Sequence, residues 1–213
     1  MMKLTIFGAS GPTGQLITQK ALASGHAVTV LVRSPGKMEP APSALSVLRG
    51  DVLDSEAVAT AVAGADAVIC CLGSSRILPP VTVFSDGVRN ILEGMRRSGS
   101  RRLAVVSSGG TNPRMDLRNP LLFELILKPL VYRVPYADMR AMEARVMASD
   151  CDWTLLRPPQ LTDQPETHAT VTAADSFSIP GKRTLTRADL AATALRVLDD
   201  PTTFRRAIAV AGA

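Results

Sequence analysis

A chain of 213 residues can form one sizeable hydrophobic core but is short for two domains of ordinary size, so a single domain over residues 1–213 is expected. Its 46% hydrophobic, 20% charged and 4% aromatic residues are typical of a globular protein, and no apolar run reaches the roughly 18 residues of a membrane span. The formal net charge of +5 is spread along the chain without a basic stripe interleaved with aromatic residues, so neither nucleic acid nor a membrane is expected as a partner.

The start of the chain does not show the charged, apolar and cleavage regions of a signal peptide, and the three cysteines form no C-x-x-C pair. An odd number of cysteines without a disulfide framework favours a reducing compartment, so we expect a cytoplasmic location. Cys70 and Cys71 lie in an apolar strand pattern and are expected to be buried. Because His26 and His168 lie far apart in the chain, no metal site is predicted.

Strand and helix patterns alternate through the first half of the chain. Apolar, β-branched runs predict strands at residues 3–8, 26–34, 44–51, 66–73 and 101–108. Helical spacing of apolar residues predicts helices at residues 14–24, 54–65 (with Asp54 as the N-cap) and 81–99. Near-continuous apolar strands are typical of a parallel sheet that is covered on both faces. The chain is therefore predicted to have an α/β fold, a Rossmann-type doubly wound parallel sheet with helices on both faces.

The alternation breaks after residue 108. Residues 109–135 and 160–185 are expected to be loops on the substrate side of the domain. The apolar stretch at 121–135, with Pro129 in its middle, is compatible with a lid, a subunit contact or core, and the protein is expected to be a monomer or a small homo-oligomer. The remaining elements are expected at residues 136–150 (helix), 152–159 (strand), 186–200 (helix) and 205–212 (strand).

Side-chain patterns mark the two later helices. Thr186 and Asp189 resemble a capping box at the start of the helix at 186–200, with Asp in place of Glu or Gln. The helix at 136–150 is predicted to carry an apolar face made of Met139, Met142, Val146 and Met147.

Three evenly spaced glycines, Gly8, Gly11 and Gly14, lie between the first strand and the first helix. The start of a helix offers unpaired N–H groups and partial positive charge, which favour phosphate, and glycine lets a pyrophosphate approach the backbone. The spacing G-x-x-G-x-x-G differs from G-x-G-x-x-G, and no Gly-Lys-Ser/Thr of a P-loop follows. Its place in a βαβ unit predicts dinucleotide binding rather than an ordinary glycine-rich turn. Ser10 and Thr13 add hydroxyl donors at the loop.

The end of the second strand indicates which dinucleotide is bound. NAD-binding domains tend to place an acidic residue about 20 positions after the glycine loop, where it accepts the ribose 2′-hydroxyl. Here that position holds Arg33, followed by Ser34. The planar, permanently charged guanidinium suits a 2′-phosphate, and Lys37 could add charge. The pattern favours NADP(H) over the alternative of a plain surface arginine.

Two further strand ends fit the same ligand, because ligands in open α/β sheets bind beyond the carboxyl ends of the strands. Asp51 could hydrogen-bond the adenine amino group and Val52 could pack on its ring, although Asp51 is equally compatible with a turn. Gly73 would let the backbone pass close to the cofactor.

Several strings resemble the atypical short-chain dehydrogenase/reductases of the NAD(P)-binding, NmrA-like kind, and most closely their flavin reductases of the biliverdin reductase B type. The strings are IFGASGPTG, VTVLVRS, GDVLD, DAVICCLG, SDGVRNI, DWTLLRPP, LTDQP and TRADLA. The resemblance is strong over residues 2–108 and 136–165 and poor over 109–135, the part that would border the substrate. It implies an NADPH-dependent reductase that acts on flavins, quinones or other planar conjugated acceptors.

The resemblance also implies which residues bind the cofactor. They are Gly8, Ala9, Ser10, Gly11, Pro12, Thr13, Gly14, Arg33, Ser34, Asp51, Val52, Leu72, Gly73, Ser107, Pro158, Pro159, Gln160 and Leu161. One departure is Gln160, which stands where the flavin reductases have histidine.

The residues expected in catalysis are Ser107, Ser108, Tyr136 and Arg140. Typical short-chain dehydrogenases use a serine and a Tyr-x-x-x-Lys pair, in which the lysine lowers the pKa of the tyrosine. Arg140 stands at the lysine place and keeps the charge but cannot share protons, so Tyr136 is either the acid or a packing residue. In the alternative, hydride passes to a stacked acceptor, water supplies the proton, and Ser107 or Ser108 orients the reactants.

Two other functions stay open. NmrA-like proteins include redox sensors that bind the cofactor without turnover, so a non-enzymatic NADP(H)-binding regulator is the main alternative. A sugar-nucleotide epimerase is disfavoured because the C-terminal part is short for a sugar-nucleotide domain.

Overall fold

A computed structural model describes residues 1–35, 42–74, 80–115 and 121–213. Its centre is an eight-stranded sheet with the order β3-β2-β1-β4-β5-β6-β10-β8. All neighbours in this sheet are parallel except β8, which runs antiparallel to β10. The strands are β1 Lys3–Phe7, β2 Ala27–Val32, β3 Leu45–Arg49, β4 Ala67–Cys70, β5 Arg102–Val106, β6 Asp152–Arg157, β8 Thr170–Ala174 and β10 Arg206–Gly212.

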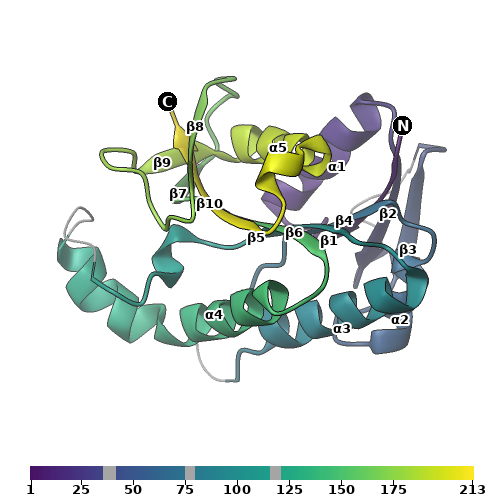
Figure 1. The fold of residues 1–213 in the computed structure, drawn as a ribbon, viewed down its shortest axis with the longest axis horizontal. Coiled ribbons are helices and arrows are strands. Elements are labelled where there is room, and N and C mark those ends of the chain that lie inside the picture. The colour runs from purple at the N-terminus through teal and green to yellow at the C-terminus, as the bar shows by residue number, and fades with distance from the viewer. Residues whose placement is uncertain (36–41, 75–79, 116–120) are drawn as a thin grey trace.

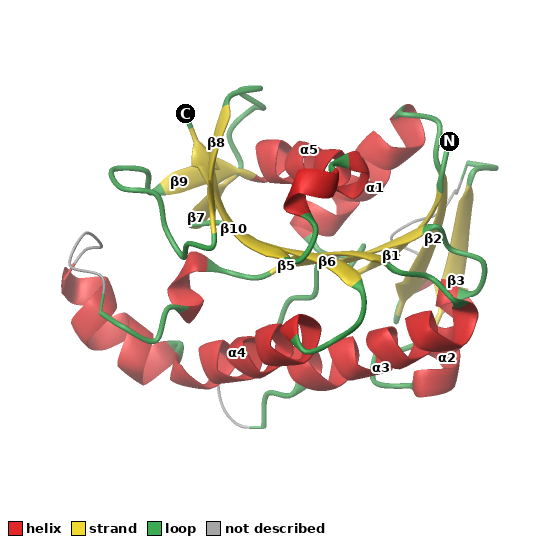
Figure 2. Ribbon diagram, in the orientation of Figure 1, coloured by secondary structure: helices red, strands yellow, loops and turns green. Residues whose placement is uncertain are grey.

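Helices cover both faces of the sheet, as Figure 1 and Figure 2 show. The helices α1 Pro12–Ala23 and α5 Arg187–Arg196 pack against each other on one face. The other face carries α2 Ser55–Val62, α3 Val83–Ser98 and α4 Arg133–Met147. The predicted α/β, doubly wound architecture is therefore confirmed, and Asp54 caps α2 as expected by accepting from the N–H groups of Glu56 and Ala57.

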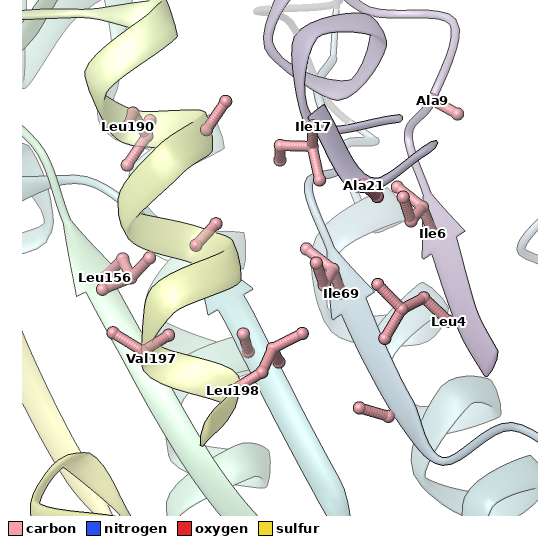
Figure 3. Packing of buried hydrophobic residues seen from close by; sticks show 14 of the residues in the cluster. Leu4, Ile6, Ala9, Ile17, Ala21, Ile69, Leu156, Leu190, Val197 and Leu198 are labelled. Atoms are coloured by element: carbon pink, nitrogen blue, oxygen red, sulfur yellow. The ribbon is translucent and has the colours of Figure 1, made fainter. Parts of the chain in front are cut away.

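The core is divided by the sheet into two layers. Beneath α1 and α5, the buried side chains include Leu4, Ile6, Ile17, Ala21, Ile69, Leu156 and Leu190 (Figure 3). Beneath α2, α3 and α4 they include Phe7, Val68, Ile91, Leu103, Met142 and Trp153. Because successive side chains of a strand point to opposite faces, strands covered on both sides need apolar residues at nearly every position. This requirement explains the continuous apolar runs of the sequence.

The segments expected as loops contain regular structure. Within 160–185 the structure has β8 and the strand β7 Gln160–Thr162, which pairs in parallel with β9 Thr184–Thr186. The expectation of a loop was wrong here because β8 completes its hydrogen bonds on the free edge of β10, a partner distant in sequence.

Within 109–135, the described residues form a 3₁₀ turn η2 Gly109–Thr111 and a π-helix η3 Phe123–Val131. The expectation of a loop was wrong here as well. Near the end of η3, the N–H of Tyr132 donates to the carbonyl of Leu127 at 3.0 Å, an i→i+5 bond. The interior residue Pro129 has no N–H to donate. Two further 3₁₀ turns, η4 Val197–Asp199 and η5 Pro201–Thr203, follow α5.

Two helix details differ from expectation. Met147 is 46% exposed, whereas Met142 and Val146 are fully buried, because residue 147 lies past the end of the stripe that faces the sheet. At α5 the Thr186 hydroxyl accepts from the Asp189 N–H at 3.0 Å, as in a capping box. The Asp189 carboxylate instead accepts from the Thr186 hydroxyl and from the N–H groups of Thr167 and His168. It therefore ties the helix start to the loop before β8.

Candidate functional site

A cavity of about 960 Å³ opens beyond the carboxyl ends of β1, β2, β4 and β5. The strand order reverses between β1 and β4, and ligands of open α/β sheets bind at such a reversal. The expected cofactor residues that line the cavity are Gly8, Ser10, Gly11, Pro12, Thr13, Gly14, Arg33, Asp51, Val52, Leu72, Gly73, Ser107 and Leu161. Residues from six separate stretches of the sequence are thus brought to one place.

The glycine loop has no room for side chains at its two ends. Gly8 has φ of +83°, and a Cβ built there would lie 2.1 Å from the carbonyl oxygen of Cys71 on the neighbouring strand end. A Cβ on Gly14 would lie 2.2 Å from the oxygen of Gly8, so the helix packs directly on the turn before it. Glycine is therefore required at both positions.

The start of α1 is suited to an anion. Its N-cap is Gly11, which offers no side-chain cap, and Pro12 follows at the first helical position, where no N–H is needed. The backbone N–H groups and the positive end of the helix dipole therefore face the cavity instead of a capping side chain. The glycine loop thus leaves a space at the start of a helix that side chains would otherwise fill. Such a space fits the pyrophosphate of a dinucleotide.

Arg33 and Asp51 are the charged residues among those that line the cavity in the described chain. Arg33 follows directly after β2 and is exposed, so its guanidinium can reach a ligand. Asp51 accepts from the N–H of Leu53 at 3.0 Å, which confirms that it forms a turn. The Asn90 side chain donates to the carbonyl of Val52 at 3.0 Å and holds this turn against α3. Lys37 lies outside the described residues.

The cysteines do not supply reactive thiols to the cavity. Cys71 lines it, and burial raises the pKa of the Cys71 thiol to about 12. Burial likewise raises the pKa of the neighbouring Cys70 thiol to about 12. Both are therefore protonated at neutral pH, and the thiolate is the nucleophilic form.

Ser107 lies on the cavity wall at the end of β5 and is held by a buried network. Its hydroxyl donates to Oε1 of Glu143 at 2.5 Å, and the hydroxyl of Thr111 lies 3.1 Å from the same oxygen. Arg157 donates to both oxygens of Glu143, from Nη2 at 2.7 Å and from Nε at 3.2 Å. The Arg157 guanidinium also lies 3.9 Å from the centre of the Phe177 ring.

Glu143 and Arg157 were not among the site residues predicted from the sequence. A signal was present, since Glu143 falls on the same helical stripe as Met139, Met142 and Val146, and Arg157 ends a buried strand. Two opposite charges at positions predicted to be buried indicate a pair.

Several expected residues do not line the cavity. Ala9 is completely buried behind the loop, and Ser34, Pro158, Pro159 and Gln160 also do not contribute to the wall. Of the expected catalytic residues only Ser107 lines it, and Ser108, Tyr136 and Arg140 do not. The structure therefore does not bring the four expected catalytic residues together, and their roles stay predictions.

Tyr136 lies behind the η2 turn, where a Cβ on Gly110 would be 2.4 Å from the Tyr136 hydroxyl. Burial raises the pKa of Tyr136, while a hydrogen bond with the Ser108 side chain lowers it to a smaller extent. Arg140 is not among the groups that act on the Tyr136 pKa. The residue of α4 that reaches the cavity is the apolar Met139, whereas Arg140, which stands at the lysine place of the Tyr-x-x-x-Lys pattern, does not line it.

The cavity wall also includes residues that the sequence analysis did not select. They are Phe7, Leu31, Val32, Gly50, Leu53, Cys71, Ser74, Pro80, Val81, Thr82, Val83, Val106 and Met139. The start of α3 forms part of this wall. Its position is fixed by α4, because Asp138 of α4 accepts from the N–H groups of Phe84 and Ser85 at 2.9 and 3.3 Å.

Comparison with known proteins agrees with this geometry. Residues 8–201 match the model of a family described as NAD(P)H-binding. An uncharacterised chloroplast protein of Arabidopsis thaliana is 31% identical over 176 residues, which cover 78% of this chain and 61% of the relative. A 3-diazoavenalumate denitrifying reductase of a Streptomyces species is 33% identical over 117 residues, 50% of this chain and 38% of the relative.

Some relatives are much longer than this chain. An uncharacterised protein of Mycobacterium tuberculosis is 31% identical over 115 residues, which are 54% of this chain but 13% of that protein. The chain therefore spans less than two thirds of the length of these three curated relatives.

Solved structures share the fold. A short-chain dehydrogenase/reductase of Veillonella parvula in complex with NADP has a TM-score of 0.81 at 19% identity, covering 99% of this chain and 94% of that one. A candidate NADH-flavin reductase of Streptococcus pneumoniae has a TM-score of 0.79 at 21% identity and covers both chains completely.

Proposed function

The chain belongs to the NAD(P)H-binding family, and we propose that it is an NADPH-dependent reductase that transfers hydride to a flavin, a quinone or a similar planar conjugated acceptor. The observation that carries the cofactor preference is Arg33, the lining cation at the end of β2. A carboxylate in this place would accept a ribose hydroxyl, whereas a guanidinium can pair with the two charges of a 2′-phosphate. The reductases among the relatives and neighbours support the reaction class.

The lining residues support an acceptor whose reduction needs little general acid–base catalysis by the protein. Among the described lining residues, Arg33, Asp51 and Cys71 are the titratable ones, and none of them lies on β5, β6 or α4 beside Ser107. Val106, Met139 and Leu161 instead give this end of the cavity an apolar wall. When bound, the cofactor supplies the hydride. The chain contributes a site that aligns cofactor and acceptor, and solvent supplies the proton.

A cofactor test separates NADPH from NADH. Arg33→Glu is expected to raise the KM for NADPH by about tenfold or more, because a salt bridge becomes a repulsion, and to change the KM for NADH little. Arg49→Glu is a matched control, since Arg49 is an exposed arginine at the end of the neighbouring strand β3 and does not line the cavity. Equal losses for both cofactors in Arg33→Glu would remove the 2′-phosphate assignment.

The second candidate is a non-enzymatic NADP(H)-binding regulator, and the observation that favours it is that neither Tyr136 nor Arg140, the residues at the places of the catalytic tyrosine and lysine, lines the cavity. Purified protein would be mixed with NADPH and with FMN, riboflavin or a quinone, and the nicotinamide absorbance band would be followed. Oxidation of NADPH that depends on the acceptor supports the reductase. Tight NADPH binding without oxidation across the panel would replace it with the regulator.

A further inference from the structure

The segment of residues 121–130 has an unusual surface. Its exposed side chains are all apolar: Leu121, Leu122, Leu125, Ile126, Leu127, Pro129 and Leu130. The most exposed are Leu122 at 62% and Leu130 at 76%. Single exposed leucines are ordinary, but a contiguous group of this kind marks an interaction surface. In Figure 1 this part of the chain lies at the left end of the molecule, where it continues the line of α4.

The polar side chains of the same segment face inward. Glu124 is 5% exposed, and its Oε2 lies 2.9 Å from the Nζ of Lys128. Lys128 also donates to the carbonyl of Arg114 at 3.1 Å, which fixes the segment to the chain before it. The segment is therefore inverted relative to an ordinary surface helix, whose apolar stripe faces the core. The Glu124–Lys128 ion pair orients the segment. The exposure of its leucines is therefore a defined feature of the fold and does not result from fraying of a helix end.

The exposed charges next to this segment in the described chain are positive. In the described parts of 109–135, the exposed charged side chains are Arg114 and Arg133, and the one carboxylate, Glu124, is buried. Tyr132, which is 37% exposed, ends the segment with a ring that is apolar on its faces and polar at its tip. Leucines flanked by arginines and an interfacial tyrosine are the pattern of an element that lies on an anionic lipid surface.

A second copy of the chain fits the exposed surface of residues 121–130 less well than a lipid surface does. A helix–helix contact uses one stripe of side chains, whereas seven of the ten residues at 121–130 are exposed and apolar, more than one such stripe provides. A twofold contact would also place the same positive charges, Arg114 and Arg133, on both sides of the interface.

We propose that residues 121–130 dock the protein on an anionic bilayer surface, with the exposed leucines at the boundary between head groups and acyl chains. This inference departs from the expectation that no membrane is a partner, but it needs no spanning segment. None of the helices in the described ranges has the length and apolar character to cross a bilayer.

The test is co-sedimentation of the full chain, without nucleotide, with vesicles of phosphatidylcholine alone or of phosphatidylcholine with phosphatidylglycerol. We expect binding to the anionic vesicles that weakens with salt. The triple variant Leu122→Ser/Leu125→Ser/Leu130→Ser should bind the anionic vesicles with an affinity at least about tenfold lower than the parent. The affinity of Arg114→Gln/Arg133→Gln for these vesicles should fall several-fold. Met147→Ser, which removes an exposed apolar side chain of α4 far from the segment, should bind like the parent.

Folding of each variant is checked by circular dichroism and by its unfolding temperature, which substitutions at these exposed positions should leave nearly unchanged. Equal vesicle binding by the parent and the triple variant would overturn the proposal. So would a concentration-dependent dimer in light scattering that the triple variant loses, with no binding to vesicles, because the surface would then be a contact between copies. Since the assay contains no cofactor or acceptor, its outcome is independent of the proposed reductase activity.

Discussion

Glu143 and Arg157 form a buried ion pair with two hydrogen bonds directly behind Ser107, and their side chains are 4% and 6% exposed. The same Oε1 of Glu143 accepts the Ser107 proton. A hydroxyl has one hydrogen, so the Ser107 oxygen can offer a ligand in the cavity its lone pairs but no proton. The pair thus sets the polarity of the cavity wall, and Ser107 is expected to accept a hydrogen bond from a bound cofactor or acceptor.

Removal of one partner of this pair should destabilise the protein strongly. Glu143→Gln leaves the Arg157 charge buried without its counter-charge and is expected to lower the free energy of unfolding by about 3–5 kcal/mol. Urea unfolding measures the difference. The control Glu93→Gln removes one partner of the exposed Arg96 pair and should not shift the midpoint measurably. Identical midpoints for Glu143→Gln and the parent would show that the buried pair contributes nothing.

Gly14→Ala should weaken both the fold and nucleotide binding. The added methyl would lie 2.2 Å from the Gly8 oxygen and 2.8 Å from the Ala9 Cα, and backbone atoms cannot move away cheaply. We expect a loss of about 1–3 kcal/mol in thermal unfolding and at least about tenfold weaker NADPH binding. Gly94→Ala in α3 is the matched control, because its methyl would meet Ala59 Cα at an ordinary 3.4 Å. A Gly14→Ala protein that binds NADPH like the parent would contradict the close approach of helix and turn.

Tyr136→Phe should leave turnover nearly intact. A general acid contributes about 10²- to 10⁴-fold, but Tyr136 does not line the cavity and burial raises its pKa. We therefore expect kcat to fall by less than about threefold and the pH profile to keep its shape. A loss of about a hundredfold in kcat at unchanged KM would instead make Tyr136 the proton donor.

The ionisation of Asp189 is expected to make the stability of the protein depend on pH. Burial opposes its ionisation, but hydrogen bonds from Thr186, Thr167 and the N–H of His168 outweigh this effect and hold the pKa below its ordinary value of 3.8. The stabilisation is therefore complete above the unfolded pKa near 3.8 and is lost as the pH falls through the folded pKa. Asp189→Asn should lower the unfolding temperature more at pH 7 than at a pH below the folded pKa of Asp189, where the parent carboxyl is protonated. An equal decrease at both would show that the ionised form is not the one stabilised.

The sequence was most informative where structure depends on neighbours in the chain. The apolar runs predicted the central strands, Asp54 predicted a helix start, and the glycine loop with Arg33 predicted where the cavity lies. Contacts between distant segments could not be read in the same way. β8 exists because β10 offers a free edge, and the Glu143–Arg157 pair depends on how α4 is rotated against β6. The same rotation turns Met139, and not Arg140, toward the cavity.

The packing of α5 on α1 has a consequence for synthesis on the ribosome. Among the described residues that line the cavity, nearly all lie within the first 107, and only Met139 and Leu161 follow. The apolar layer of Leu4, Ile6 and Ile17, in contrast, is completed by α5 and β10, which are synthesised after these lining residues. A nascent chain therefore carries a nearly complete nucleotide cradle while one face of its sheet is still open to chaperones and to misassembly. Loss of α5 and β10 would leave every chain in that state.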